Sequence, residues 1–165
     1  YVRSHVDLSN VCMVSPDAGR IRVAEKWSAK LGGCPLAFVH KTRDTTRPNV
    51  AVANRVVGDV AGKQCVLVDD MIDTAGTISE AVKVVMNAGA SSVIVAATHG
   101  ILSDPAAQRL SECGAQEVIV TDTLPIALEK RFDKLTILPI APLLARAIRE
   151  VFDDGSVTSL FDGVA

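Results

Sequence analysis

The stretch Cys65–Ser79, CVLVDDMIDTAGTIS, decides the fold. Its first residues form a continuous apolar run, which is typical of a strand buried on both faces of a sheet. This strand ends on Asp69 and Asp70, and a turn of small and polar residues leads into a helical pattern, Ile78–Ala88, that Gly89 closes. Strand, tight turn and helix in this order predict one half of a parallel β–α–β unit.

Apolar runs of the same kind recur before and after this unit. They are Val11–Val14, Leu36–His40, Val93–Ala97, Val118–Thr121 and Leu135–Leu138, with helical patterns between them at Arg20–Leu31 and Pro105–Cys113. Parallel strands need crossover connections, and helical crossovers are right-handed. The alternation therefore predicts an α/β fold with a doubly wound parallel sheet and helices on both faces. A last helical pattern, Pro142–Phe152, is expected to pack on an outer face.

The segment from Lys41 to Gly62 breaks this alternation. It begins with the polar residues TRDTTRPN and continues as VAVANRVVGDV, in which apolar and polar side chains alternate. The first part is typical of a mobile loop and the second of a half-buried antiparallel strand. We therefore expect a loop followed by an antiparallel hairpin, or flap strand.

Composition limits the classes of function. With 165 residues, 48% of them hydrophobic, the chain can close one core, and we expect a single domain over residues 1–165. The net charge of -2 and the lack of a long basic run argue against nucleic acid as a partner. No apolar stretch reaches the ~20 residues that span a bilayer, and the start has no signal-peptide core. These features predict a soluble cytoplasmic protein with no membrane partner.

The cysteines, the histidines and the first residue add two expectations. The four cysteines form no CxxC pair and the three histidines share no metal-ligand spacing, so any bound metal should be a hard cation on oxygen ligands. The chain starts at Tyr1 without an initiator Met and soon enters its first strand, which suggests a fragment of a longer protein.

The turn Asp73–Thr77 has the chemistry of a phosphate site. Backbone N–H groups of a small-residue turn and of a helix N-terminus can surround a phosphate, and the hydroxyls of Thr74 and Thr77 add donors. The carboxylates of Asp69 and Asp70 would repel a phosphate, but they suit the vicinal hydroxyls of a ribose whose 5-phosphate lies one turn further on. The alternative is that the first residues of the turn only cap the helix, which would leave the acid pair unexplained.

The segment VLVDDMIDTAGT resembles the phosphoribosyl diphosphate fingerprint that phosphoribosyltransferases and ribose-phosphate diphosphokinases share. Its turn matches the Asp-Thr-Ala/Gly-Gly-Thr form of the diphosphokinases, whereas many transferases have a small or hydroxyl residue at the first of these positions. The resemblance implies a sheet of the phosphoribosyltransferase type. It also implies that the sugar phosphate is bound by Asp69, Asp70, Asp73, Thr74, Ala75, Gly76 and Thr77.

Two further loops resemble the diphosphokinases. VSPDAGRIRVAEKW is similar to their diphosphate loop, Ser-Pro-Asp-x-Gly-Gly, and this implies that Asp17 is a Mg²⁺ ligand. The residues alone leave Asp17 equally open to a role as a helix N-cap. Arg20 departs from the pattern, because a second Gly is common at its position, and it could add a charge contact.

The other loop, LAFVHKTRDTTRPN, is similar to the flexible catalytic loop, whose Lys-x-Arg corresponds to Lys41 and Arg43. The resemblance implies that these two cations stabilise the transition state of diphosphoryl transfer. Without the other motifs, a solvated pair of cations on a surface loop would be the usual explanation.

The resemblance extends over the whole chain, up to the C-terminal DGSVTSLF, and implies the C-terminal half of a ribose-phosphate diphosphokinase. Such an enzyme transfers the diphosphoryl group of MgATP to the 1-hydroxyl of ribose 5-phosphate, giving phosphoribosyl diphosphate and AMP for nucleotide biosynthesis. The implied partners are ribose 5-phosphate, ATP, a missing N-terminal half and other copies in a homo-oligomer. Two alternatives stay open: a phosphoribosyltransferase that uses phosphoribosyl diphosphate, and a non-catalytic regulatory homologue.

Overall fold

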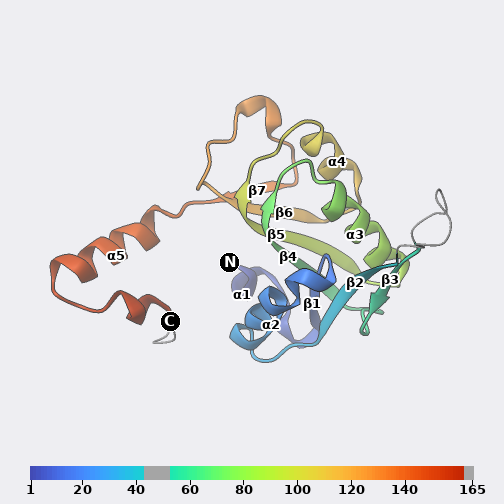
Figure 1. The fold of residues 1–165 in the computed structure, drawn as a ribbon, viewed down its shortest axis with the longest axis horizontal. Coiled ribbons are helices and arrows are strands. Elements are labelled where there is room, and N and C mark those ends of the chain that lie inside the picture. The colour runs from blue at the N-terminus through green and yellow to red at the C-terminus, as the bar shows by residue number, and fades with distance from the viewer. Residues whose placement is uncertain (43–52, 162–165) are drawn as a thin grey trace.

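The computed structural model describes residues 1–42 and 53–161, without the side chains of residues 41, 42 and 53. Seven strands form one sheet in the spatial order β3-β2-β1-β4-β5-β6-β7 (Figure 1). Their bounds are β1 Val11–Ser15, β2 Leu36–Thr42, β3 Ala53–Val57, β4 Gln64–Ile72, β5 Ser92–Gly100, β6 Glu117–Thr121 and β7 Leu135–Leu138. All neighbouring pairs are parallel except β2 and β3. The predicted α/β class is confirmed.

Helices cover both faces of this sheet (Figure 1). The α-helices are α1 Val2–His5, α2 Ile21–Lys30, α3 Gly76–Asn87, α4 Ala106–Glu112 and α5 Ala141–Phe152. Short 3-10 helices are η1 Leu8–Asn10, η2 Ala18–Arg20, η3 Leu128–Lys130 and η4 Val157–Phe161. Among these described residues, no helix has the length and apolar character needed to cross a membrane.

The central strands are buried on both sides, which explains their continuous apolar sequence. Along β4, Cys65 and Leu67 point into the core that α3 and α4 cover, whereas Val66 and Val68 point into the core shared with α1 and α2. All four side chains are fully buried. Because alternate residues of a strand face opposite sides, only a strand without polar positions can fill both cores.

The predicted flap corresponds to β3, which pairs antiparallel with β2 at the edge of the sheet. Asn54 and Val56 alternate with more exposed neighbours, as the sequence pattern indicated, and the Asn54 amide donates to the carboxylate of Glu80 on α3. Most of the polar loop predicted before it, including Arg43, lies outside the described residues.

Several strands are longer than predicted, and the extension of β4 bears on the candidate site. We expected β4 to end on Asp69 and Asp70, but it continues to Ile72. The reason is its partner, because β5 is also long and pairs its His99 and Gly100 with the last residues of β4. The acid pair therefore lies on regular strand, and the turn into α3 starts only after it.

The last helix, α5, contradicts its prediction, because it does not pack on an outer face of the sheet. It stands clear of the layers at the end of an extended segment that follows β7, and its main contacts are with η4 (Figure 1). Its apolar side chains are open to solvent, with Ile148 68% and Phe152 87% exposed. Amphipathic periodicity predicts that a helix buries one face but does not specify the surface that covers it.

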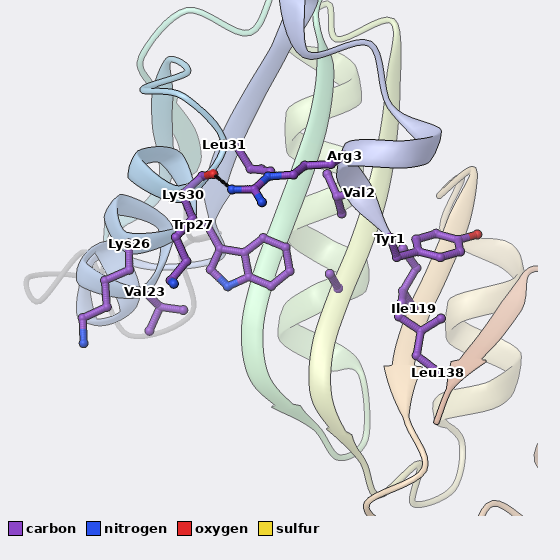
Figure 2. Close-up of a pocket in the computed structure, with 11 residues that line it drawn as sticks. Tyr1, Val2, Arg3, Val23, Lys26, Trp27, Lys30, Leu31, Ile119 and Leu138 are labelled. Carbon is purple, nitrogen blue, oxygen red and sulfur yellow. Dashed lines mark hydrogen bonds between the residues drawn. The ribbon is translucent and has the colours of Figure 1, made fainter. Parts of the chain in front are cut away.

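The α2 side of the sheet carries an apolar groove of about 540 Å³. Trp27 on α2 and Leu31, which directly follows α2, face it from one side, with Ile119 and Leu138 on the other side (Figure 2). Trp27 belongs to the core stripe of its helix, yet it is only half-buried, because it faces this groove. None of the predicted site residues lines this groove.

Candidate functional site

The candidate site lies where the order of the strands reverses. From β1 the chain moves to β2 and β3 on one side of the sheet, and from β4 it moves to β5, β6 and β7 on the other. Ligands of open parallel sheets bind beyond the carboxyl ends of the strands at such a switch point. In this chain, the loops after β1 and β4 therefore form the expected position of a ligand.

These loops enclose a small pocket of about 240 Å³. It is lined by Asp17, Arg20, Asp69, Asp70, Met71, Ile72, Asp73, Thr74, Ala75, Gly76, Thr77 and Ile78. The fold thus brings together every predicted residue of the sugar-phosphate segment and the predicted metal ligand. The volume of this pocket lies below the ~300–1,000 Å³ of typical drug-sized sites, which suits a small ligand.

Asp69 and Asp70 occupy consecutive positions near the end of β4. The Asp69 side chain is 14% exposed and that of Asp70 is 37% exposed. The Asp70 backbone N–H donates to Oδ1 of Asp69 at 2.9 Å. Two adjacent carboxylates, one more buried than the other, give the pocket a strongly negative end.

Arg20 neutralises part of this charge. Its Nη1 lies 2.7 Å from Oδ2 of Asp70, and its Nε lies 3.6 Å from Oδ1 of Asp69. The contact joins the loop after β1 to the end of β4 across the pocket. The sequence indicated that Arg20 departs from a motif and could add a charge contact, but it did not identify the two acids as partners. An ion pair between distant segments leaves no local pattern.

The pKa values of the two acids are shifted in opposite directions. Burial, together with the neighbouring charge of Asp70, raises the pKa of Asp69 to about 6. Burial also acts on Asp70, but its hydrogen bond with Asp69 and the nearby Arg20 guanidinium outweigh it, so the pKa of Asp70 lies below its ordinary value. At neutral pH both carboxylates are mainly ionised and can accept hydrogen bonds from hydroxyl groups.

The turn after β4 presents backbone amides to the pocket. Ala75 adopts a left-handed conformation with φ of 58° and serves as the N-cap of α3, which begins at Gly76. The first amides of a helix have no partner within it, and the positive end of the helix dipole lies there. Such a turn can hold an anion.

The alternative explanation of this turn, that its side chains only cap the helix, is wrong. No side chain caps α3, and Asp73 and Thr74 are exposed. The backbone of the turn is instead held by two side-chain hydrogen bonds. Arg109 on α4 donates to the Thr74 carbonyl at 2.9 Å, and Ser79 Oγ donates to the Gly76 carbonyl at 3.1 Å. Neither supporting residue was predicted, because the Arg109 contact joins distant segments and the Ser79 contact lies inside a helical pattern.

Asp17 does act as an N-cap. Its Oδ1 accepts from the backbone N–H groups of Gly19 at 2.8 Å and Arg20 at 3.1 Å, which caps η2. The capping alternative for Asp17 is therefore confirmed, and it does not compete with metal binding. Within the described part of the chain, no hydrogen bond or ion pair involves Oδ2 of Asp17, which leaves a hard carboxylate oxygen for a cation.

The described residues contain no group of three or more His, Cys, Asp or Glu side chains that could hold a metal alone. Of the two predicted catalytic cations, Lys41 has its backbone near the end of β2, opposite Asn54 of β3, whereas Arg43 lies outside the described residues.

Comparisons with known proteins agree with this arrangement. A ribose-phosphate pyrophosphokinase of Bifidobacterium longum is 70% identical over 164 residues, which are 98% of this chain and 48% of that protein. The solved phosphoribosylpyrophosphate synthetase of Mycobacterium smegmatis is 60% identical with a TM-score of 0.84, and the match covers 94% of this chain and 49% of that one. This chain thus spans about half the length of the curated relatives it matches.

A more distant solved structure supports the fold alone. Orotate phosphoribosyltransferase from Aeropyrum pernix has a TM-score of 0.55 at 17% identity, over 84% of this chain and 66% of that one. The sheet is therefore of the phosphoribosyltransferase type, as predicted. The model of one family, described as "Phosphoribosyl synthetase-associated domain", matches residues 10–162, and the chain belongs to that family.

Proposed function

We propose that this chain supplies the phosphoribosyl half of the active site of a ribose-phosphate diphosphokinase. The observation that carries the proposal is one pocket lined both by an acid pair and by the turn at the start of α3, where the first helix amides have no partner within the helix. A ribose 5-phosphate has the matching chemistry, with vicinal hydroxyls that donate to carboxylates and a phosphate that accepts from amides. The high identity to ribose-phosphate pyrophosphokinases supports the same assignment.

In this proposal, Asp69 and Asp70 bind the 2- and 3-hydroxyls, and Asp73–Thr77 bind the 5-phosphate. The 1-hydroxyl oxygen of the sugar attacks the β-phosphorus of ATP, the bond from that phosphorus to the α-phosphate oxygen breaks, and AMP leaves. The 1-hydroxyl proton is lost to solvent or to a base. Lys41 and Arg43 stabilise the charge that develops during the transfer.

Asp17 is the proposed protein ligand of the Mg²⁺ that accompanies the diphosphoryl group. Oδ2 of Asp17, which has no hydrogen-bond or ion-pair partner among the residues that the structure describes, suits a hard cation. When bound, the ion neutralises phosphate charge and orients the diphosphate. The contribution of this chain is to hold Asp17 rigidly, because the η2 amides fix its other oxygen.

We further propose that the chain is the C-terminal half of its protein. Support comes from the resemblance of residues 154–161 to the terminal segment of the diphosphokinases and from relatives about twice as long. An intact mass of about twice 17.4 kDa from the native source would agree with a two-half protein. The remaining half, and neighbouring copies in a homo-oligomer, would then complete the ATP site.

The test separates the local sugar site from the complete enzyme. Supplied with MgATP and ribose 5-phosphate, residues 1–165 alone should release no AMP but should bind the sugar phosphate. Hydrogen exchange should show protection of the amides at 73–77 on binding, while the exposed α5 amides serve as an internal control. Adding the missing half should restore turnover.

Three outcomes would contradict the proposal. If ribose 5-phosphate leaves exchange at 73–77 unchanged, the sugar site is misassigned. If the full-length protein instead releases diphosphate from phosphoribosyl diphosphate only when a nucleobase is added, the phosphoribosyltransferase alternative is correct. Full-length protein that binds ribose 5-phosphate without any turnover would favour the regulatory homologue.

A further inference from the structure

Arg20 is the only cationic side chain among the described residues that line the candidate pocket. The same lining contains four carboxylates, those of Asp17, Asp69, Asp70 and Asp73. Any phosphate ester in this pocket therefore meets a strongly negative surface, apart from the amides of the turn. The position of the Arg20 guanidinium decides where the compensating charge lies.

In the structure, that guanidinium occupies acceptors that a sugar would need. Oδ2 of Asp70 is taken by Arg20 at 2.7 Å, and Oδ1 of Asp69 lies near Arg20 and accepts from the Asp70 amide. A vicinal diol that donates to both carboxylates must displace the arginine from at least Asp70. The ion pair can open readily, because the Arg20 side chain is 42% exposed and exposed ion pairs are weak.

The displaced arginine has to stay at the pocket. Its backbone is fixed in η2, where its N–H donates to Oδ1 of Asp17 at 3.1 Å. The side chain can rotate away from the acids but remains beside Asp17, the proposed ligand of the diphosphate-bound metal. A guanidinium with five donors on a planar group is well matched to phosphate oxygens.

We propose that Arg20 has two positions, pairing with Asp69 and Asp70 in the empty site and with the 1-diphosphate when phosphoribosyl diphosphate is bound. This inference rests on the proposed function. Arg20 would then discriminate between the two sugar phosphates, because ribose 5-phosphate gains nothing from the second position. Loss of the arginine removes both a competitor for the acids and a positive charge, and these effects on ribose 5-phosphate oppose each other.

The test compares two ligands in the full-length protein by calorimetry with Mg²⁺ present. In Arg20→Gln, we expect affinity for phosphoribosyl diphosphate to fall tenfold or more, while affinity for ribose 5-phosphate changes less than threefold. Arg20→Lys should lie between wild type and Arg20→Gln. The matched control is Arg22→Gln, on the exposed surface of α2 and outside the pocket, which should change neither affinity more than twofold.

Equal loss of both affinities in Arg20→Gln would overturn the inference, since Arg20 would then act only through its general charge or by ordering the acids. Unchanged affinity for phosphoribosyl diphosphate would also overturn it. If the wild-type protein binds neither ligand, the proposed function fails first. As a second readout, the NMR signal of the Arg20 Nε–H should shift on adding ribose 5-phosphate, and shift again with phosphoribosyl diphosphate.

Discussion

Lowering the pH should weaken sugar binding through Asp69. The carboxylate must be ionised to accept hydrogen bonds from ribose hydroxyls, and burial raises its pKa to about 6. With that pKa, roughly 90% of the site is competent at pH 7 and roughly 10% at pH 5. If the ionised form alone binds, affinity for ribose 5-phosphate should fall about tenfold as pH decreases from 7 to 5.

Affinity should fall as the pH is lowered because the pKa of Asp69 is raised. A raised pKa brings the protonation of Asp69 into this range, whereas an ordinary aspartate would stay ionised down to about pH 4. Asp70 adds no loss in the same window, because its pKa lies below the ordinary value. The dependence should therefore be centred near pH 6 and belong mainly to one carboxylate.

The assay is calorimetric titration with ribose 5-phosphate from pH 5 to pH 8 at constant ionic strength. A control is essential, because phosphate monoesters have a second pKa of about 6 and the ligand titrates in the same range. Asp69→Asn keeps the ligand titration and removes that of the protein. If wild type and Asp69→Asn showed the same pH dependence, Asp69 would not be the titrating acceptor and the reasoning would be refuted.

Three further perturbations test the proposed catalytic cation, the support of the turn after β4, and the exposure of α5. In the complete enzyme, Lys41→Ala should lower kcat on the order of 10²-fold with little change in the KM for ribose 5-phosphate, and a change in KM alone would make it a binding group. Arg109→Met should weaken ribose 5-phosphate binding roughly 3- to 10-fold, because the Thr74 carbonyl loses its donor, and unchanged affinity would show that the turn holds itself. By chemical denaturation of the 165-residue chain, Ile148→Ser should change stability by less than about 0.5 kcal/mol, whereas Leu110→Ala in the core should cost about 2–5 kcal/mol. A large loss in Ile148→Ser would mean that α5 packs on the sheet after all.

The sequence predicted the sheet well because burial on both faces leaves a strong local signal. A strand such as β1, whose residues are all buried, requires apolar side chains on both of its faces. Its sequence is accordingly a continuous apolar run over Val11–Val14. The grouping of the acids and the turn after β4 in one pocket could be predicted for a related reason, since they form one continuous segment of the sequence.

Features that depend on contacts between distant segments were not predictable. The extension of β4 to Ile72 is set by the equally long β5. The ion pair of Arg20 and the support of the turn by Arg109 each join parts of the chain that are far apart in sequence. The exposed face of α5 was also not predictable. Its periodicity predicted that the apolar face is buried, but among the described residues no element covers that face.

The reversal between β1 and β4 explains why the proposed sugar site can be local to this chain. Parallel strands bring their carboxyl ends to one edge, and the reversal opens a space between the two loops that follow β1 and β4. Asp17 and Arg20 enter that space from one side, and Asp69 with the turn enters it from the other. Both sides form as soon as the sheet forms, so the proposed sugar site requires only the fold described above. An ATP molecule in line with the 1-hydroxyl would extend beyond a pocket of about 240 Å³, and the groups that hold it must come from outside that pocket. The isolated chain should consequently separate binding from turnover.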